Sequence, residues 1–178
     1  MVAHKQIMPI IYMQISLHLL HRILIMSNKV LNTYKSFQKL PFGNWLFSKA
    51  VGFKTPYFRS ISPLVKILEP GQSVIFMKKK WSITNHIKSV HAIAMCNVCE
   101  FAAGLCIEVS IPAHKRWIPK SMSVNYIKIA RTDLTAYCEI KDIDWETTDV
   151  LEMYVAVKDK NEILVMDATI GMKISDKK

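Results

Sequence analysis

A long apolar segment with one acidic residue near its middle constrains this chain more than any other feature. It runs from Asn85 to Leu105, NHIKSVHAIAMCNVCEFAAGL, and spans about five helical turns if it reaches Val109. Because a helix that is apolar on nearly all sides is a buried helix, we expect residues 90–108 to form one helix inside the fold. Glu100 lies in this segment, and burying an isolated carboxylate is costly. Glu100 is therefore paired, protonated or functional.

Length and charge narrow the class of protein and of partner. The 178 residues fit one domain, or one domain with an extension, and half of them are hydrophobic, which is enough for a core. The formal net charge of +10 suits an anionic partner, such as nucleic acid, acidic lipid or coenzyme A. The basic clusters at Lys78–Lys80 and His114–Trp117 are separate, and the aromatic residues form no binding stripe. We therefore expect no nucleic-acid partner.

The cysteines indicate a reducing compartment. Three of the four, Cys96, Cys99 and Cys106, fall in the apolar segment, whereas a disulfide framework would place them in the loops of a small secreted domain. We expect these three to be buried, reduced thiols of a cytoplasmic protein. The Cys96-x-x-Cys99 spacing suggests metal or redox chemistry, but no second pair accompanies it and its setting is a helix interior. We expect no metal and no cofactor.

Residues 1–25 are apolar, with polar residues at near-helical spacing: Gln14, His18, His21 and Arg22. They make a poor transmembrane span because Arg22 and two histidines fall inside it, and no small-residue cleavage site marks a signal peptide. Two alternatives stay open: an amphipathic helix on a membrane surface or a partner, or extra chain before a start at Met26. We expect residues 1–26 to be a leader, with weak membrane contact at most.

The single domain expected over residues 27–178 begins with helices and continues with strands. Residues 27–54 predict two helical segments, with Ser27 capping the first. From residue 55, alternating apolar and polar residues between turn signals predict a sheet. The expected strands are residues 57–69, 73–81, 120–129, 133–143, 149–158 and 162–174, with a basic loop at 112–119. One apolar face of an antiparallel sheet can be covered by the long helix, so the fold class is α+β.

The order strand–strand–helix–strands resembles the hotdog fold, a curved antiparallel β-sheet wrapped around one long central helix, here with extra N-terminal helices. The spacing Asn85-x5-His91-Ala92-x7-Glu100 resembles that of the PaaI-like hotdog thioesterases. The run EFAAG from Glu100 looks similar to the YiiD C-terminal-like subgroup, and so do the segments 120–126 and 130–136. The resemblance covers roughly residues 55–174. It departs from the usual pattern at three positions: Lys88 and Ala92 stand where the family usually has glycine, and Ile93 replaces a second small residue.

This resemblance implies hydrolysis of an acyl-CoA or acyl-carrier thioester. The Ala92 N–H, at the positive end of the helix, would donate to the carbonyl oxygen, and Glu100 would be the base or nucleophile. Asn85 would orient the water or the carbonyl. Ala92 and Glu100 are about 12 Å apart along one helix, so they would act together only across a homodimer, or within a dimer of dimers. We also expect Ser121 to hydrogen-bond Glu100 or the water, and the substrate-binding residues to be His91, Ser121, Ser123 and Asn125.

Each of these residues also has a structural alternative. Glu100 would then be a buried carboxylate bonded to the sheet, Asn85 a turn residue and His91 the cap of the helix, which is the alternative we favour for His91. The polar residues of 121–125 would be a solvated strand face. Two other functions stay open. One is a non-catalytic acyl-CoA-binding hotdog protein, and the other is a hotdog dehydratase or hydratase, whose chemistry pairs a histidine with a carboxylate.

Overall fold

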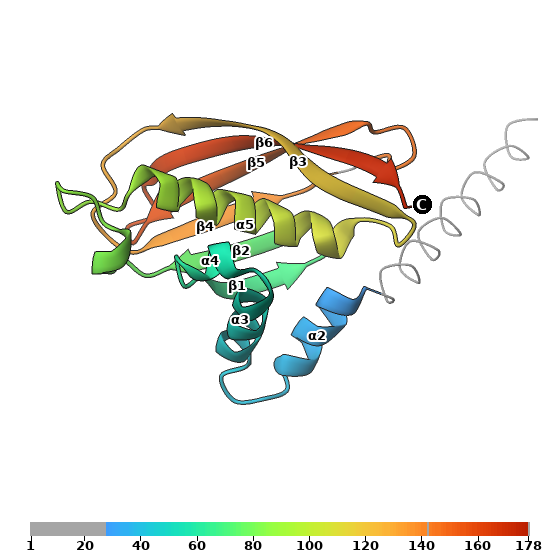
Figure 1. Ribbon diagram of the computed structural model, residues 1–178, viewed down its shortest axis with the longest axis horizontal. Helices are drawn as coiled ribbons and strands as arrows, with labels where there is room; N and C mark the ends of the chain where they lie inside the picture. The colour runs from blue at the N-terminus through green and yellow to red at the C-terminus, as the bar shows by residue number, and fades with distance from the viewer. Residues whose placement is uncertain (1–27, 142, 178) are drawn as a thin grey trace, which may run out of the picture.

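A curved antiparallel sheet wraps one long helix in the computed structural model, which describes residues 28–141 and 143–177. The sheet order is β1-β2-β4-β5-β6-β3, and the central helix is α5, Ala92–Ser110 (Figure 1). This arrangement confirms the expected hotdog fold with extra N-terminal helices. The expected leader, residues 1–26, lies outside the described residues.

The other elements follow in chain order. The helices are α2 (Lys29–Phe37), α3 (Gly43–Lys54), α4 (Pro56–Arg59) and the short 3-10 helix η1 (Trp81–Ile83). The strands are β1 (Leu64–Glu69), β2 (Gln72–Met77), β3 (Lys115–Tyr126), β4 (Leu134–Glu139), β5 (Val150–Asp159) and β6 (Leu164–Asp176).

The start of the first strand differs from our expectation. Residues 57–63 were expected in a strand, but β1 begins only at Leu64 and residues 56–59 form α4. Pro56 occupies the first position of that helix, where its fixed φ suits a helical turn and its missing N–H costs nothing. The chain therefore makes one more helical turn before it enters the sheet.

The expected basic loop at residues 112–119 is also mostly strand, because β3 begins at Lys115. The Lys115 side chain is buried, and its Nζ lies 2.9 Å from Asp176 Oδ1 and 3.2 Å from Glu146 Oε2. Lys115 and Asp176 are also direct partners in the β3–β6 ladder. The cation thus fixes the first residue of β3 to the last residue of β6.

Helix α5 forms the core with the inner face of the sheet. Most of its side chains are buried, and the Ser73 hydroxyl of β2 donates to the Ala102 carbonyl over 2.8 Å. By length and hydropathy alone α5 could cross a membrane, as core helices of globular proteins often could. Its burial within the sheet confirms instead the expected buried central helix.

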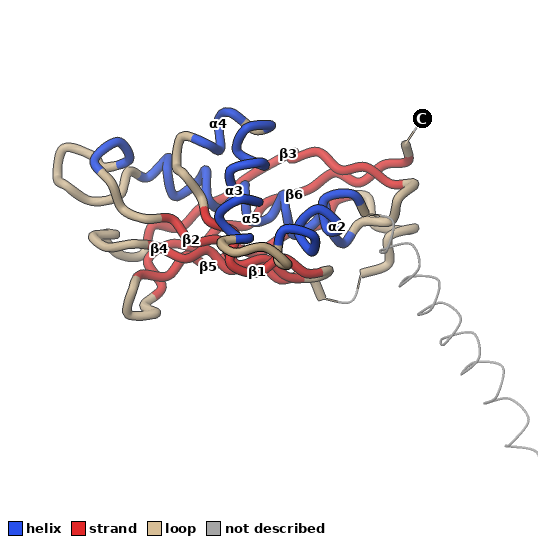
Figure 2. Tube along the Cα trace, turned by 90° about the horizontal axis from the view of Figure 1, so that it is seen from below, coloured by secondary structure: helices blue, strands red, loops and turns tan. Residues whose placement is uncertain are grey.

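Helices α2 and α3 pack beside β1 as a separate layer (Figures 1 and 2). Phe47 of α3 is almost fully buried and meets the Tyr34 ring of α2 edge-on at 5.0 Å. The Ser48 hydroxyl accepts a hydrogen bond of 2.8 Å from the Val65 N–H of β1. These contacts fix α3 to the sheet and direct its opposite face outward.

Candidate active site at the start of the central helix

One side of α5 is left incompletely covered by the fold. Its half-exposed residues recur at intervals of four, which places them on one stripe of the helix. They are Ala92, Cys96, Glu100, Gly104 and Glu108. The stripe contains two of the three residues expected to be catalytic, Ala92 and Glu100, about two turns apart, while the third, Asn85, lies in the loop before the helix.

Strand β3 runs along this stripe and contacts it on both sides of Glu100. The Tyr126 hydroxyl lies 3.2 Å from Cys96 Sγ, and the Trp117 Nε1–H donates to Glu108 Oε2 over 2.8 Å. Within residues 28–141 and 143–177, no hydrogen bond or ion pair involves the Glu100 carboxylate. The alternative of a carboxylate bonded to the sheet therefore does not hold for the described chain.

The start of α5 presents a backbone donor to a cavity. The Ala92 N–H makes no hydrogen bond to any described residue, whereas the N–H groups on either side of it, of His91 and Ile93, both do. A cavity of about 260 Å³ opens beside Ala92. Its lining includes Asn85, Ser89, Met95, Tyr126 and Lys128. A carbonyl oxygen placed there would meet both the Ala92 N–H and the positive end of the helix dipole.

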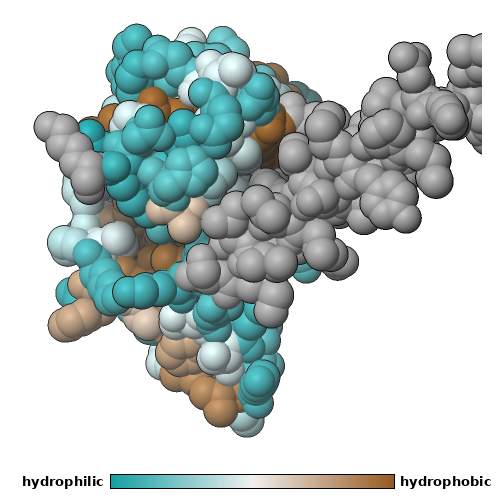
Figure 3. Space-filling view, turned by 90° about the vertical axis from the view of Figure 1, so that its right-hand side faces the viewer, coloured by the Kyte–Doolittle hydropathy of each residue, from teal (hydrophilic) through white to brown (hydrophobic). Residues whose placement is uncertain are grey.

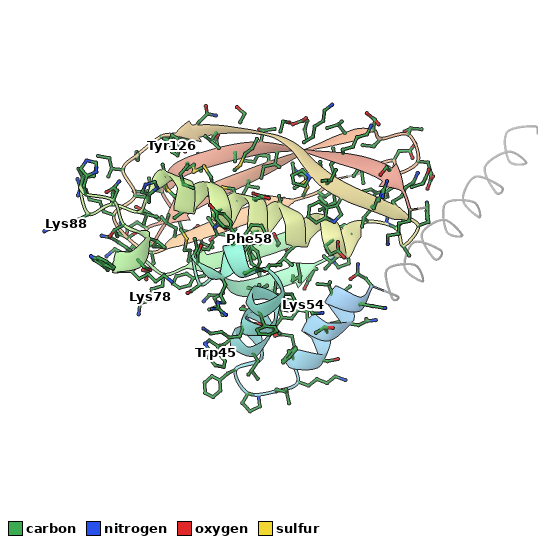
Figure 4. All side chains as sticks on the ribbon, in the orientation of Figure 1. Trp45, Lys54, Phe58, Lys78, Lys88 and Tyr126 are labelled. Carbon is green, nitrogen blue, oxygen red and sulfur yellow. The ribbon has the colours of Figure 1, made fainter. Side chains whose placement is uncertain are left out.

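Asn85 shapes the loop that leads into the helix. Its Oδ1 accepts hydrogen bonds of 3.1 Å from the N–H groups of Ile87 and Ser89, and its Nδ2 donates to Ser89 Oγ over 2.8 Å. Asn85 is thus a turn residue, as the structural alternative proposed, although it also lines the cavity. Lys88 at the tip of this loop has φ 60°, a left-handed conformation in which glycine is unstrained (Figure 4).

His91 caps the helix. Its Nδ1 accepts a 3.1 Å hydrogen bond from the Ile93 N–H, which confirms the capping role. The ring is exposed and lines a different hollow, shared with Tyr57 and Asn97. A dehydratase would need a histidine beside the carboxylate, and His91 makes no such pair with Glu100.

The polar residues of β3 do not meet Glu100 within one chain. Ser121, Ser123 and Asn125 lie opposite residues 171, 169 and 167 of β6, on the outer face of the sheet. Asn125 Nδ2 donates to Asp167 Oδ1 there over 2.8 Å. The expected hydrogen bond from Ser121 to Glu100 is therefore absent in the described chain, because alternating side chains point to opposite faces and residues 122, 124 and 126 take the helix side.

The cysteines are all free thiols. Cys99 and Cys106 are buried as expected, and burial raises the pKa of the Cys99 thiol. The expectation was wrong for Cys96, which is only half-buried because it belongs to the stripe that faces Tyr126. Among residues 28–141 and 143–177, no three His, Cys, Asp or Glu side chains gather as a metal site.

Tyr126 is the cavity residue that sequence reasoning missed. It ends β3, lies over the first turns of α5 (Figure 4), and contributes its phenol beside Ala92. The hydrogen bond with Cys96 raises the pKa of the Tyr126 phenol to about 12, so the group stays protonated and neutral near pH 7. The sequence did carry a signal for Tyr126: it occupies an apolar position in the alternating segment that forms β3, and this alternation directs its side chain toward the helix.

A curved antiparallel sheet wrapped around one central helix defines a hotdog-fold domain, and the open helix start with a carboxylate eight residues further on is its candidate site. The chain belongs to the family described as Domain of unknown function (DUF4442), whose model matches residues 43–174. The structural-genomics protein APC5556 is similar in structure, with 36% sequence identity, a TM-score of 0.75, and coverage of 83% of this chain and 99% of that one.

Two more distant structures have the same fold. The protein PA5026 of Pseudomonas aeruginosa, described as a probable thioesterase, is 18% identical with a TM-score of 0.66, covering 78% of this chain and 97% of its own. A hypothetical thioesterase of Streptococcus pneumoniae, solved with coenzyme A, is 19% identical with a TM-score of 0.56, covering 65% and 90%. No curated protein matches the chain.

Proposed function

We propose that this chain is a thioesterase for acyl-CoA or acyl-carrier substrates whose active site is completed by a second copy of the chain. One observation carries the proposal: the uncommitted Ala92 N–H and the unpartnered Glu100 carboxylate share the only stripe of α5 that the described fold leaves half-exposed. These are the two groups that thioester hydrolysis needs, a donor for the developing oxyanion and a base or nucleophile.

The chemistry divides between the two groups. The thioester carbonyl oxygen would accept from the Ala92 N–H, which stabilises the negative charge of the tetrahedral intermediate. Glu100 would take a proton from the attacking water, or attack the carbonyl carbon itself. The carbon–sulfur bond then breaks. If Glu100 acts as a base, the thiol leaves with the proton that Glu100 took from the water. If Glu100 acts as a nucleophile, a water molecule hydrolyses the acyl–Glu100 anhydride and its proton goes to the leaving thiolate. Tyr126, neutral beside the cavity, would supply a further hydrogen-bond donor.

A second chain is required because the two groups are too far apart in one chain. Eight helical residues separate them by about 12 Å along the axis. Strand β3 is an edge strand paired with β6, and its residues 118–123 are exposed. Pairing two copies of β3 about a two-fold axis would give hydrogen-bond partners to the free backbone N–H and C=O groups of both edge strands. It would also bring two α5 helices together in antiparallel orientation, with Ala92 of one near Glu100 of the other.

The substrate class follows from the cavity and its surroundings. Lys128 lines the cavity and is exposed, so it could contact a phosphate. Coenzyme A is bound in the S. pneumoniae structure named above, which supports a coenzyme A thioester as the first substrate to test.

A non-catalytic acyl-CoA-binding protein is the second candidate. The Asn85 side-chain amide is hydrogen-bonded within its own loop, which favours the binding protein, because a catalytic amide would need to turn toward the substrate. The two candidates differ in turnover: a binding protein would retain acyl-CoA without releasing free thiol.

The direct test is release of free coenzyme A from a panel of acyl-CoAs of increasing chain length. Glu100→Gln removes the base while keeping the size of the side chain, and we expect it to lower kcat about 10²–10⁴-fold. Glu108→Gln is the matched control on the same stripe, since its amide oxygen can still accept from Trp117. Unchanged turnover in Glu100→Gln would contradict the proposed role of Glu100. Tight binding without turnover in the wild type would favour the binding protein.

A further inference from the structure

Almost all the net positive charge of the protein lies in its N-terminal part. The first 68 residues hold nine of the 24 Lys and Arg residues and none of the 14 Asp and Glu residues, because the first acidic residue is Glu69. The other 110 residues are nearly neutral, with 15 basic and 14 acidic side chains. Helices α2, α3 and α4 therefore form a purely cationic layer on a nearly neutral domain.

The outward face of α3 combines this charge with exposed aromatic rings. Phe42, Trp45 and Phe53 are 85%, 53% and 81% exposed. Trp45, Lys49 and Phe53 recur at intervals of four and fall within about 80° of arc on the helix, and Phe42 precedes the helix as its N-cap residue. Lys49 Nζ lies 5.6 Å from the centre of the Trp45 ring, and Lys54 extends the charge at the end of the helix (Figure 4).

The loop before α3 holds its apolar residues in a fixed position. Phe42 has φ 59°, a left-handed conformation that a bulky residue rarely adopts. Gly43 begins α3 so close to α2 that an added Cβ would lie 2.0 Å from the Phe37 carbonyl oxygen. Leu40, 51% exposed, precedes them. Figure 3 shows hydrophobic side chains gathered at this lower tip of the molecule, beside hydrophilic ones.

The positive charges of this layer are not neutralised. No ion pair within residues 28–141 and 143–177 involves the basic side chains of α2, α3 or α4. Residues 1–27 contain no Asp or Glu that could pair with them.

We propose that the α3 stripe, Phe42, Trp45, Lys49 and Phe53, docks the protein on an anionic lipid membrane. Aromatic and aliphatic side chains partition into the headgroup region, while lysines contact acidic headgroups. This combination separates a membrane from a nucleic acid, which offers no apolar phase for Leu40, Phe42 and Phe53. The docking surface is distinct from the cavity at Ala92 and does not depend on the proposed catalysis.

The test is co-sedimentation of the full chain with phosphatidylcholine vesicles, with and without phosphatidylserine. We expect binding only with the acidic lipid, weakening as salt rises. Lys49→Gln and Lys54→Gln should each lower the partition coefficient about five-fold, and Trp45→Ser with Phe53→Ser should abolish binding. Lys160→Gln and Ile163→Ser, in the exposed β5–β6 turn, are matched controls that should bind like the wild type.

A lipid with brominated acyl chains gives a second measurement that does not depend on the folding of the variants. It should quench part of the tryptophan fluorescence of the wild type, and that quenched part should be lost in the conservative variant Trp45→Phe, which keeps the other three tryptophans. The proposal is overturned if the wild type ignores acidic vesicles, or if folded α3 variants still bind them normally. It is also overturned if these variants lose binding to random RNA while vesicle binding is unchanged.

Discussion

Ala92 and Glu100 lie on one stripe of α5, two turns apart, and within the described residues neither the Ala92 N–H nor the Glu100 carboxylate makes a hydrogen bond. The first N–H groups of a helix have no acceptor within it, and the half-exposed Glu100 carboxylate has no donor in the described chain, so both groups are open to water or to a partner outside the chain. A thioester bound between two antiparallel α5 helices would supply an acceptor for the Ala92 N–H and a reacting group for the Glu100 carboxylate.

The first prediction concerns the residue between them. If Ala92 of one subunit lies opposite Glu100 of the other, then the Cys96 residues of the two subunits lie opposite each other, because Cys96 is midway between Ala92 and Glu100. We expect a short bis-maleimide to crosslink the dimer through Cys96, as seen by denaturing electrophoresis. Cys96→Ser should abolish the crosslink.

The buried thiols provide the control for this experiment. Cys99→Ser should crosslink like the wild type, because burial raises the pKa of Cys99 and leaves little reactive thiolate. Persistence of the crosslinked dimer in Cys96→Ser would contradict the proposed alignment of the two helices.

The second prediction concerns acid stability at the β3–β6 end. Lys115 lowers the pKa values of both Glu146 and Asp176 below their ordinary range. Their ion pairs therefore stabilise the fold above about pH 4, and this stabilisation is lost as pH falls through the lowered values. Lys115→Met should flatten the decrease in the free energy of unfolding between about pH 5 and 2, measured by urea titration. Lys160→Met should keep the wild-type slope, and equal slopes for both variants would count against the network.

The third prediction concerns the loop before α5. Lys88 is held at φ 60°, so Lys88→Gly should remove backbone strain and stabilise the protein by about 0.5–1 kcal/mol, raising Tm by about 1–4 °C. Lys78→Gly is the control, since Lys78 is exposed and lacks a positive φ, and glycine there should lower Tm. A lower Tm for Lys88→Gly in a thermal melt would show that the lysine side chain itself stabilises the loop.

Sequence periodicity predicted the parts of this structure that depend on local repeats. The long apolar run predicted one buried helix over residues 90–108, close to the observed Ala92–Ser110, and a two-residue period separated Ser121, Ser123 and Asn125 from the apolar face of β3. Which strand face looks toward the helix depends on the whole sheet. For that reason the expected contact between Ser121 and Glu100 was not found in the chain.

Other features depend on contacts between distant segments. Lys115 belongs to a strand because Asp176, about 60 positions later, pairs with it, and the local sequence HKRW carries no trace of that pairing. Cys96 was expected to be buried because its neighbours are apolar, but the sheet leaves its side of the helix partly open. The left-handed conformation of Phe42 follows from the close approach of α2 and α3 at Gly43.

The shared active site is tested most directly by mixing two inactive variants. Glu100→Gln removes the base or nucleophile, and Ala92→Leu blocks approach to the backbone donor, so each homodimer should be inactive. A heterodimer would combine both lesions in one site and leave the other site intact. After co-expression with two affinity tags, we expect the purified heterodimer to regain about half the wild-type turnover per dimer. No recovery in a folded heterodimer of confirmed composition would mean that Ala92 and Glu100 do not act across an interface.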